Sequence, residues 1–176
     1  MQNIQITRIA ADDLPRALPG LADTLLACVA DGASVGFIQP FDRRAATAFW
    51  RDRVFPGVIA GGTTIFAAWR DGAVVGTVQL GTDLMPNQPH RADVAKMLVH
   101  PRARRTGIAR ALMQRLEAEA RARHKTLLVL DTRSGDPAQK LYAGLGFEVA
   151  GEISGYCRHP SEDRFEATTY MYKALT

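Results

Sequence analysis

Apolar positions recur with a helical period in the segment that follows Pro101. From Ile108 to Ala120 an apolar residue stands at every fourth position, with polar residues between, which is the spacing of one buried helix face. An apolar run at 94–99 precedes this pattern and stops at Pro101. The pattern therefore predicts a strand, a short basic turn and a helix that begins at Gly107.

Turn and cap residues divide the rest of the chain. Asp71-Gly72 between two apolar runs indicates a hairpin. Asp12-Asp13 and Asp136-Pro137 are typical of helix starts, and Pro56-Gly57 of a helix end. The run Leu127–Leu130 favours a central strand covered on both faces. We expect a mixed α/β sheet with strands at 3–9, 63–70, 73–80, 94–99, 127–130, 147–153 and 165–173, and helices at 14–29, 41–54, 107–120 and 138–145.

The length of 176 residues, with 47% hydrophobic and 23% charged residues, is typical of a globular protein with one domain spanning 1–176. The first residues lack the basic-then-apolar order of a signal peptide, and no apolar run approaches a membrane span. Cys28 and Cys157 form neither a disulfide framework nor a metal spacing. We expect a cytoplasmic protein with reduced thiols and no contact with a membrane.

The net charge of +4 includes 18 arginines, several of which lie between residues 102 and 123. No zinc knuckle and no basic face interleaved with aromatic residues is visible, so we expect no nucleic-acid partner. The first turn of a helix leaves backbone amides free, and Gly107 lets a ligand approach them. A pyrophosphate fits such a turn, although an ordinary solvated helix start would show the same pattern. The arginines around it are Arg102, Arg104, Arg105 and Arg110.

Two motifs in order resemble the GCN5-related N-acetyltransferase (GNAT) superfamily. The signature [Q/R]-x-x-G-x-[G/A] matches residues 104–109, and LYxxxGF matches Leu141–Phe147, with an expected strand between them. The resemblance covers essentially the whole chain. It implies the GNAT fold, with a six- to seven-stranded mixed sheet, about four helices and splayed fourth and fifth strands. It also implies acetyl-CoA as the co-substrate and no metal.

Four shorter strings resemble the acetyltransferases that confer tabtoxin resistance. They are GASVGF at 32–37, RADVAKMLV at 91–99, LLVLDT at 127–132 and GYC at 155–157. This narrower resemblance implies transfer of acetyl to a small amine, such as an amino-acid-like toxin or antibiotic. Acetylation of a protein N-terminus or lysine, and a non-catalytic acetyl-CoA sensor, remain alternatives. A homodimer is also possible, because dimers are common in the superfamily.

The resemblance implies a set of residues that hold the co-substrate. The backbone of the fourth strand should hold the acetyl-pantetheine arm, and the amides of the following turn should bind the pyrophosphate. In one respect the chain departs from the family, because Gly135 stands where an Asn often contacts the pantetheine. The implied residues are Met97, Leu98, Val99, Arg104, Arg105, Thr106, Gly107, Ile108, Ala109 and Arg110.

Three side chains are candidates for the chemistry. An amine must lose its proton before it attacks a thioester, so a carboxylate base is useful. Asp93 and Asp131 are expected where one strand begins and the next ends, and either can act directly or through water. Tyr142, in the LYxxxGF element, is expected to protonate or hydrogen-bond the leaving sulfur. Each residue also has a structural alternative: Asp93 as a carboxylate at the end of a loop, Asp131 as a cap between strand and helix, and Tyr142 as a packing residue. We expect direct attack in a ternary complex rather than an acyl intermediate on Cys157.

Overall fold

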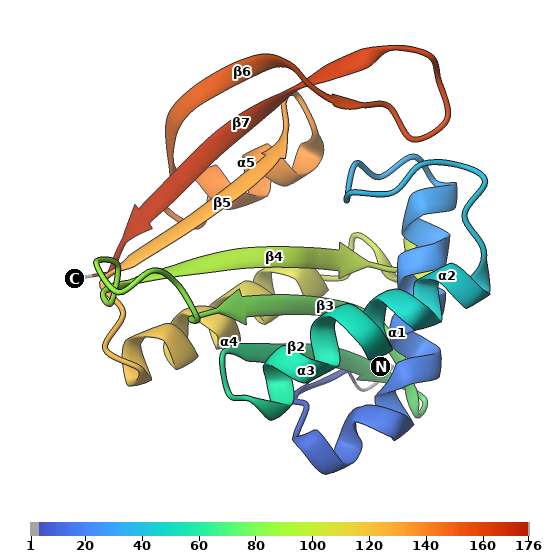
Figure 1. Cartoon of the computed structure of the whole chain (residues 1–176), viewed down its shortest axis with the longest axis horizontal. Helices are drawn as coiled ribbons and strands as arrows, with labels where there is room; N and C mark the ends of the chain where they lie inside the picture. The colour runs from blue at the N-terminus through green and yellow to red at the C-terminus, as the bar shows by residue number, and fades with distance from the viewer. Residues whose placement is uncertain (1–3, 176) are drawn as a thin grey trace.

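The chain forms a seven-stranded sheet with helices on both faces (Figure 1), in a computed structural model that describes residues 4–175. The strand order is β1-β2-β3-β4-β5-β7-β6. Strands β4 and β5 are parallel and the other neighbours are antiparallel. The predicted mixed sheet is confirmed, and residue 3 of the expected first strand lies outside the described residues. The strands are β1 (Gln5–Arg8), β2 (Thr63–Arg70), β3 (Ala73–Gly81), β4 (Arg91–Val99), β5 (Leu127–Arg133), β6 (Glu148–Arg158) and β7 (Phe165–Ala174).

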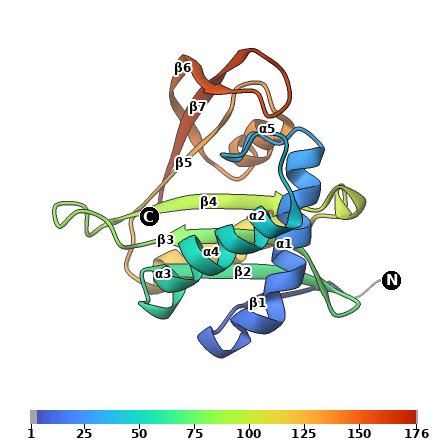
Figure 2. The same cartoon turned by 45° about the vertical axis from the view of Figure 1, so that its right-hand side comes forward.

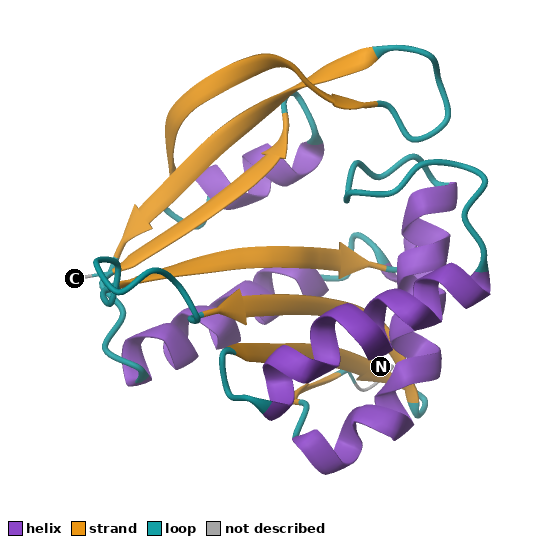
Figure 3. Cartoon of the chain, viewed as in Figure 1, coloured by secondary structure: helices purple, strands orange, loops and turns teal. Residues whose placement is uncertain are grey.

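Helices α1, α2 and α3 lie on one face of the sheet and α4 lies on the other, as Figures 1 and 2 both show. Helix α5 lies beside β5, in the arm that β5, β6 and β7 form (Figure 3). None of the described helices is both long and apolar enough to cross a membrane. The helices are α1 (Leu14–Ala30), α2 (Arg43–Ala48), α3 (Phe55–Ile59), α4 (Ile108–Ala122) and α5 (Pro137–Ala143), with a π-helical turn at Phe49–Val54.

Strand alternation produces two apolar cores, one on each face. On β2, Ile65 and Ala67 pack under α1, whereas Phe66 and Ala68 pack under α4. This follows from the period of two along a strand, which sends successive side chains to opposite faces. The sheet between α1 and α4 is therefore buried on both sides and forms a rigid base for the strand β4.

Strands β4 and β5 pair over only three residues and then separate. The paired residues are Arg91 to Asp93 on β4 and Leu127 to Val129 on β5. The two strands meet near the C-terminus and diverge toward the loop that follows α1 (Figure 1). Beyond Asp93, the edge of β4 that faces β5 is free of strand pairing. The expected splay of the fourth and fifth strands is confirmed.

The expectation that β5 is covered on both faces is wrong. Leu128 and Leu130 are buried in the core under α4, but Leu127 and Val129 on the other face are only half-buried. Helix α1 packs on β3 and β4 and helix α3 packs on β2, and neither packs extensively on this face of β5. A continuous apolar run does not distinguish this half-covered strand from a fully covered one.

Several expected helix ends also differ. Asp42 caps α2, because its carboxylate accepts from the amide of Ala45 at 2.7 Å, but Asp13 and Asp136 make no side-chain cap. Asp136 instead accepts from the guanidinium of Arg133. The helix expected to end before Pro56 continues through a π-helical turn into α3, where Pro56 occupies the first turn. Proline is tolerated there because its missing amide has no helical partner to lose.

Candidate active site

The face of the sheet opposite α4 gathers the two candidate carboxylates. Paired residues of parallel strands share a face, so Asp93 lies on the same face as Val129. Asp131, two residues further along β5, shares that face as well. Both lie within strands, because β4 begins at Arg91 and β5 continues to Arg133. The structure therefore corrects their expected positions at strand ends, and it removes the loop-end and helix-cap roles as explanations.

Asp131 is exposed, and its charge affects the pKa values of Lys96, Tyr142 and Tyr170. Burial lowers the pKa of Lys96, and the negative charge of Asp131 opposes that change. The pKa of Tyr170 rises to about 12, mainly through its hydrogen bond with Tyr156 and in smaller part through Asp131. The carboxylate thus stands at the centre of a polar group on the open side of β5.

Tyr142 belongs to the opposite face of the sheet. It extends from α5 into the core under α4, where its ring lies 5.8 Å from that of Phe147 and its exposed fraction is 6%. Burial raises the pKa of Tyr142 far above its usual value, and the charge of Asp131 adds to the rise. The phenol therefore stays protonated at neutral pH and is better suited to donate a hydrogen bond than to give up its proton.

Asp93 is bound to a neighbour rather than to the group around Asp131. Its carboxylate accepts from Nη2 of Arg91 at 3.3 Å, and its side chain is 43% exposed. Arg91, two residues earlier on β4, lies on the same face. The structure thus places Lys96 within the influence of Asp131, buries Tyr142 on the other face of the sheet and holds Asp93 in an ion pair with Arg91.

The turn before α4 has the geometry of an anion site. Gly107 has a φ of +83°, in the left-handed region that favours glycine, and no described atom lies within 4 Å of a Cβ built there. The first backbone bond of α4 runs from the amide of Ala111 to the carbonyl of Gly107, so the amides of residues 108–110 have no helical partner. The hydroxyl of Thr106 donates to the carbonyl of Ala103 at 2.7 Å and fixes the turn.

Two arginines of the cluster, Arg104 and Arg110, bond to other parts of the protein. Arg104 points to the end of α1, where it pairs with Asp31 at 2.5 Å and donates to the carbonyl of Val99 at 3.2 Å. The thiol of Cys28 donates to the same carbonyl at 3.4 Å, and Arg110 donates to the carbonyl of Gly144 at 3.5 Å. Fewer arginine side chains are therefore free beside the turn than the sequence indicates. Arg102 and Arg105 remain exposed beside the turn.

Along β4, Leu98 is buried and pairs with Thr77, whereas Met97 is only half-buried beside the split. The carbonyl of Val99 already accepts the two bonds from Cys28 and Arg104. Of the three residues expected to hold the pantetheine arm, Met97 is the one that has neither such bonds nor a partner in the register with β3. The free edge, rather than the end of the strand, is thus the part available to a ligand.

Loop 31–42, which joins α1 to α2, contacts the arm formed by β5, β6 and β7. The hydroxyl of Ser34 lies 3.3 Å from the thiol of Cys157, and the amide of Gln39 donates to the carbonyl of Pro160 at 2.7 Å. Arg133 donates to the carbonyl of Gly32 at 3.0 Å. The strings GASVGF and GYC, far apart in the sequence, therefore meet at the open end of the split between β4 and β5.

Lys96 is a site residue that the sequence reasoning missed. It lies in a bulge where β4 shifts register against β3, and its φ is +49°. The one available signal was a lysine inside an apolar strand segment, RADVAKMLV. Nothing in the sequence indicates that the bulge turns this side chain toward β5.

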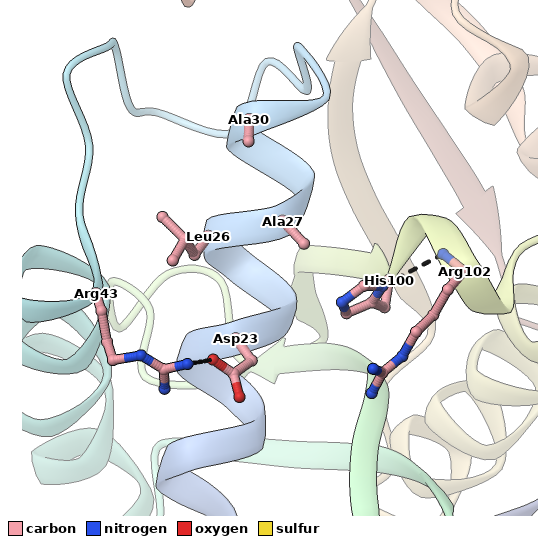
Figure 4. A pocket seen from close by; sticks show the side chains of 7 residues that line it. All are labelled: Asp23, Leu26, Ala27, Ala30, Arg43, His100 and Arg102. Atoms are coloured by element: carbon pink, nitrogen blue, oxygen red, sulfur yellow. Dashed lines mark hydrogen bonds and ion pairs between the residues drawn. The ribbon is translucent and has the colours of Figure 1, made fainter.

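A pocket of about 290 Å³ lies elsewhere, between α1, α2 and the turn after β4 (Figure 4). Arg43 and Asp23 form an ion pair at its rim. Nδ1 of His100 accepts from the amide of Arg102 at 3.3 Å. None of the three candidate catalytic residues lines this pocket. Within residues 4–175, no three His, Cys, Asp or Glu side chains are grouped to hold a metal.

Comparison with known proteins gives the same architecture. A structure from Salmonella typhimurium, described as an acetyltransferase with its cofactor acetyl-CoA, matches with a TM-score of 0.78 and 20% identity, over 99% of this chain and 95% of that one. An N-acetyltransferase from Staphylococcus aureus Mu50 matches with a TM-score of 0.78 and 23% identity, over 99% of both chains. A ribosomal-protein-alanine N-acetyltransferase from Brucella melitensis matches at 0.74 and 24%, over 97% of this chain and 99% of that one.

These identities establish the fold. The model of the acetyltransferase (GNAT) family matches residues 35–147, which include the strand β4, the turn at Gly107 and the LYxxxGF element. The match therefore spans both the split between β4 and β5 and the anion site at its end. The chain belongs to the GNAT family of acetyltransferases.

Proposed function

We propose that this protein transfers acetyl from acetyl-CoA to the amine of a small amino compound, such as an amino-acid-like toxin or antibiotic. The observation that carries the proposal is the split between β4 and β5. It has free backbone amides at one end and a group of polar side chains, centred on Asp131, along it. Direct transfer between two bound substrates fits this arrangement.

The residues present fit acetyl-CoA. The amides of residues 108–110 and the open space at Gly107 suit a pyrophosphate. The unpaired edge of β4 offers backbone groups to an extended arm that runs toward Asp131. When bound, acetyl-CoA supplies a thioester carbonyl that a neutral amine can attack. The solved structure from Salmonella typhimurium, which contains acetyl-CoA, supports this choice of donor.

The carboxylates act on the acceptor. An amine with a pKa near 10 is neutral in only about one molecule in a thousand at pH 7. Asp131 lies on the open face of β5, where it attracts the ammonium group and receives its proton directly or through water. Asp93 shares that face and adds negative charge, although its ion pair with Arg91 weakens its attraction. Asp131 is therefore the stronger candidate for the base.

Tyr142 acts on the other side of the split. Its phenol remains protonated because burial opposes its ionisation. It can therefore donate a hydrogen bond from Oη to the sulfur as negative charge develops there. Asp131, which acts on the acceptor amine, and Tyr142, which acts on the thioester sulfur, therefore lie on opposite faces of the sheet.

The two cysteines do not favour an acyl-enzyme. Burial raises the pKa of the Cys28 thiol, which also donates to the carbonyl of Val99. The thiol of Cys157 lies beside the hydroxyl of Ser34, which is no base. A nucleophilic cysteine needs a neighbour that removes its proton. Direct attack by the amine is therefore the mechanism we propose.

The substrate class is supported by the contact between loop 31–42 and β6. The strings GASVGF and GYC, which resemble tabtoxin-resistance acetyltransferases, meet at the open end of the split. A loop that contacts β6 at this end of the split favours a small acceptor over a folded protein surface. An amino-acid-like toxin or antibiotic is consistent with that restriction.

Thiol release from acetyl-CoA tests the proposal. The purified protein is assayed with a panel of small amines and amino acids, with a peptide that begins with alanine, and without acceptor. We expect release to depend on a small amine. Release with the peptide alone would support protein N-terminal acetylation instead. Binding of acetyl-CoA without any release would favour the sensor and contradict the proposal.

A further inference from the structure

The side chain of Lys96 extends from the bulge of β4, and its amino group lies on the side of the split where we propose that the acceptor amine binds. Its Nζ lies 5.5 Å from the centre of the Phe49 ring, and Phe49 packs in the core under α1. Phe49 in turn stacks edge-on against Phe37 of loop 31–42, with ring centres 5.0 Å apart. These contacts place the amine on the face that also bears Asp93 and Asp131.

The bulge makes this placement possible. Between Thr77 and Gln79 the register of β3 against β4 shifts, and Lys96 takes a left-handed φ of +49°. A residue with a Cβ disfavours that conformation. If the bend alone mattered, glycine or asparagine would suit this position better. We therefore infer that the lysine side chain has a role beyond the backbone conformation.

The donors of Lys96 are unused within the described part of the chain. Its ammonium contacts the Phe49 ring and is influenced by the charge of Asp131, but among the described residues it forms no hydrogen bond and no ion pair. Burial lowers the pKa of the amine, because the charged form loses solvation, and Asp131 opposes that change only in part. An anion beside it would stabilise that charged form.

A second donor lies next to it. Gln79 faces Ala95 across the ladder, one residue before Lys96, and its exposed fraction is 8%. Its Nε2 is buried without a hydrogen-bond partner among residues 4–175. Buried polar groups in proteins are nearly always paired, so unpaired donors at neighbouring positions of adjacent strands indicate a ligand with acceptor oxygens.

The opposite charges of this face are complementary to a zwitterion. Asp131 on β5 suits an ammonium group, and the amine on β4 suits a carboxylate across the split. We propose that Lys96, assisted by Gln79, binds the carboxylate of an amino-acid acceptor and so selects amino acids over amines that lack one. The inference rests on the proposed function and names the substrate class of the same site.

The test compares each amino acid with its own carboxamide. Standard L-amino acids and their carboxamides are assayed as acceptors with the wild-type enzyme and with Lys96→Met, which keeps the length of the side chain. We expect the wild type to prefer the acid of the best pair by at least about tenfold in kcat/KM. In Lys96→Met this preference should disappear through a higher KM for the acid, with the carboxamide little changed.

Two variants and one binding measurement complete the design. Lys96→Arg should keep part of the preference, because the charge is retained, and Lys140→Met removes an exposed lysine of α5 and should leave it unchanged. Acetyl-CoA binding to Lys96→Met, measured by titration, shows that the variant is folded. Equal loss for acids and carboxamides, or a wild type without preference, would overturn the role of Lys96 and leave the transferase standing. A wild type that binds acetyl-CoA but acetylates no acceptor would overturn the proposed function, and this inference with it.

Discussion

At the scale of single residues, the candidate chemistry is divided between the two faces of the sheet. Asp131 stands exposed on the face that α1 to α3 leave open, whereas Tyr142 is buried on the face covered by α4. Burial raises the pKa of Tyr142, and the charge of Asp131 adds to that rise. This arrangement suits the reaction, because the base acts on the attacking amine and the hydrogen-bond donor acts on the thiol that leaves on the opposite side.

Replacing Tyr142 by Phe tests the donor side. We expect turnover to fall at least about tenfold, because a hydrogen bond to the developing charge on sulfur is lost, while the KM for acetyl-CoA changes little. Tyr172→Phe is the matched control, since this tyrosine is on β7 and donates to Glu148 at 3.1 Å. Steady-state kinetics measure both. Unchanged turnover in Tyr142→Phe would remove the phenol from the reaction.

Replacing Asp131 by Asn tests the base. At pH 7 we expect kcat/KM for the amine to fall at least about tenfold. The loss should shrink as the pH rises toward the pKa of the acceptor, because the amine then loses its proton to solvent. Asp52→Asn, which removes an exposed carboxylate paired with Arg51, should leave the profile unchanged. The same pH profile in Asp131→Asn and the wild type would show that another group removes the proton.

At the scale of elements, the segment from β4 to α4 was the most predictable part of the chain. Its apolar period, Pro101 and Gly107 are local signals, and the strand, turn and helix appear where they indicate. The bulge at Lys96 could not be predicted, because it arises from pairing with β3 rather than from local sequence. The continuation of α2 past Pro56 and the half-covered face of β5 depend in the same way on tertiary packing.

Gly107→Ala tests the turn. A Cβ at a φ of +83° should cost about 1 kcal/mol of stability and should crowd the amides of residues 108–110, so the KM for acetyl-CoA should rise at least about threefold. Gly61→Ala is matched, because Gly61 has the same φ of +83° and open space around it. Thermal unfolding and kinetics separate the effects. An equal KM in both variants would show that the turn does not hold the donor.

At the scale of the whole molecule, the site depends on contacts between distant parts of the chain. Loop 31–42 is tied to the arm by Ser34 with Cys157, by Gln39 with Pro160, and by Arg133 with Gly32. Sequence motifs predicted the family, and they nominated candidate residues for the site. They could not predict that these two strings meet, since more than a hundred residues separate them. The same holds for the charge of Asp131 reaching Lys96 and Tyr142.

The dependence of the initial rate on both substrates tests the central claim most directly. If donor and acceptor meet across the split between β4 and β5, rates measured at several fixed acceptor concentrations should give intersecting double-reciprocal lines. Mass spectrometry of the enzyme incubated with acetyl-CoA alone should then show no acetylated cysteine. Parallel lines, together with acetyl on Cys157, would contradict direct transfer in a ternary complex.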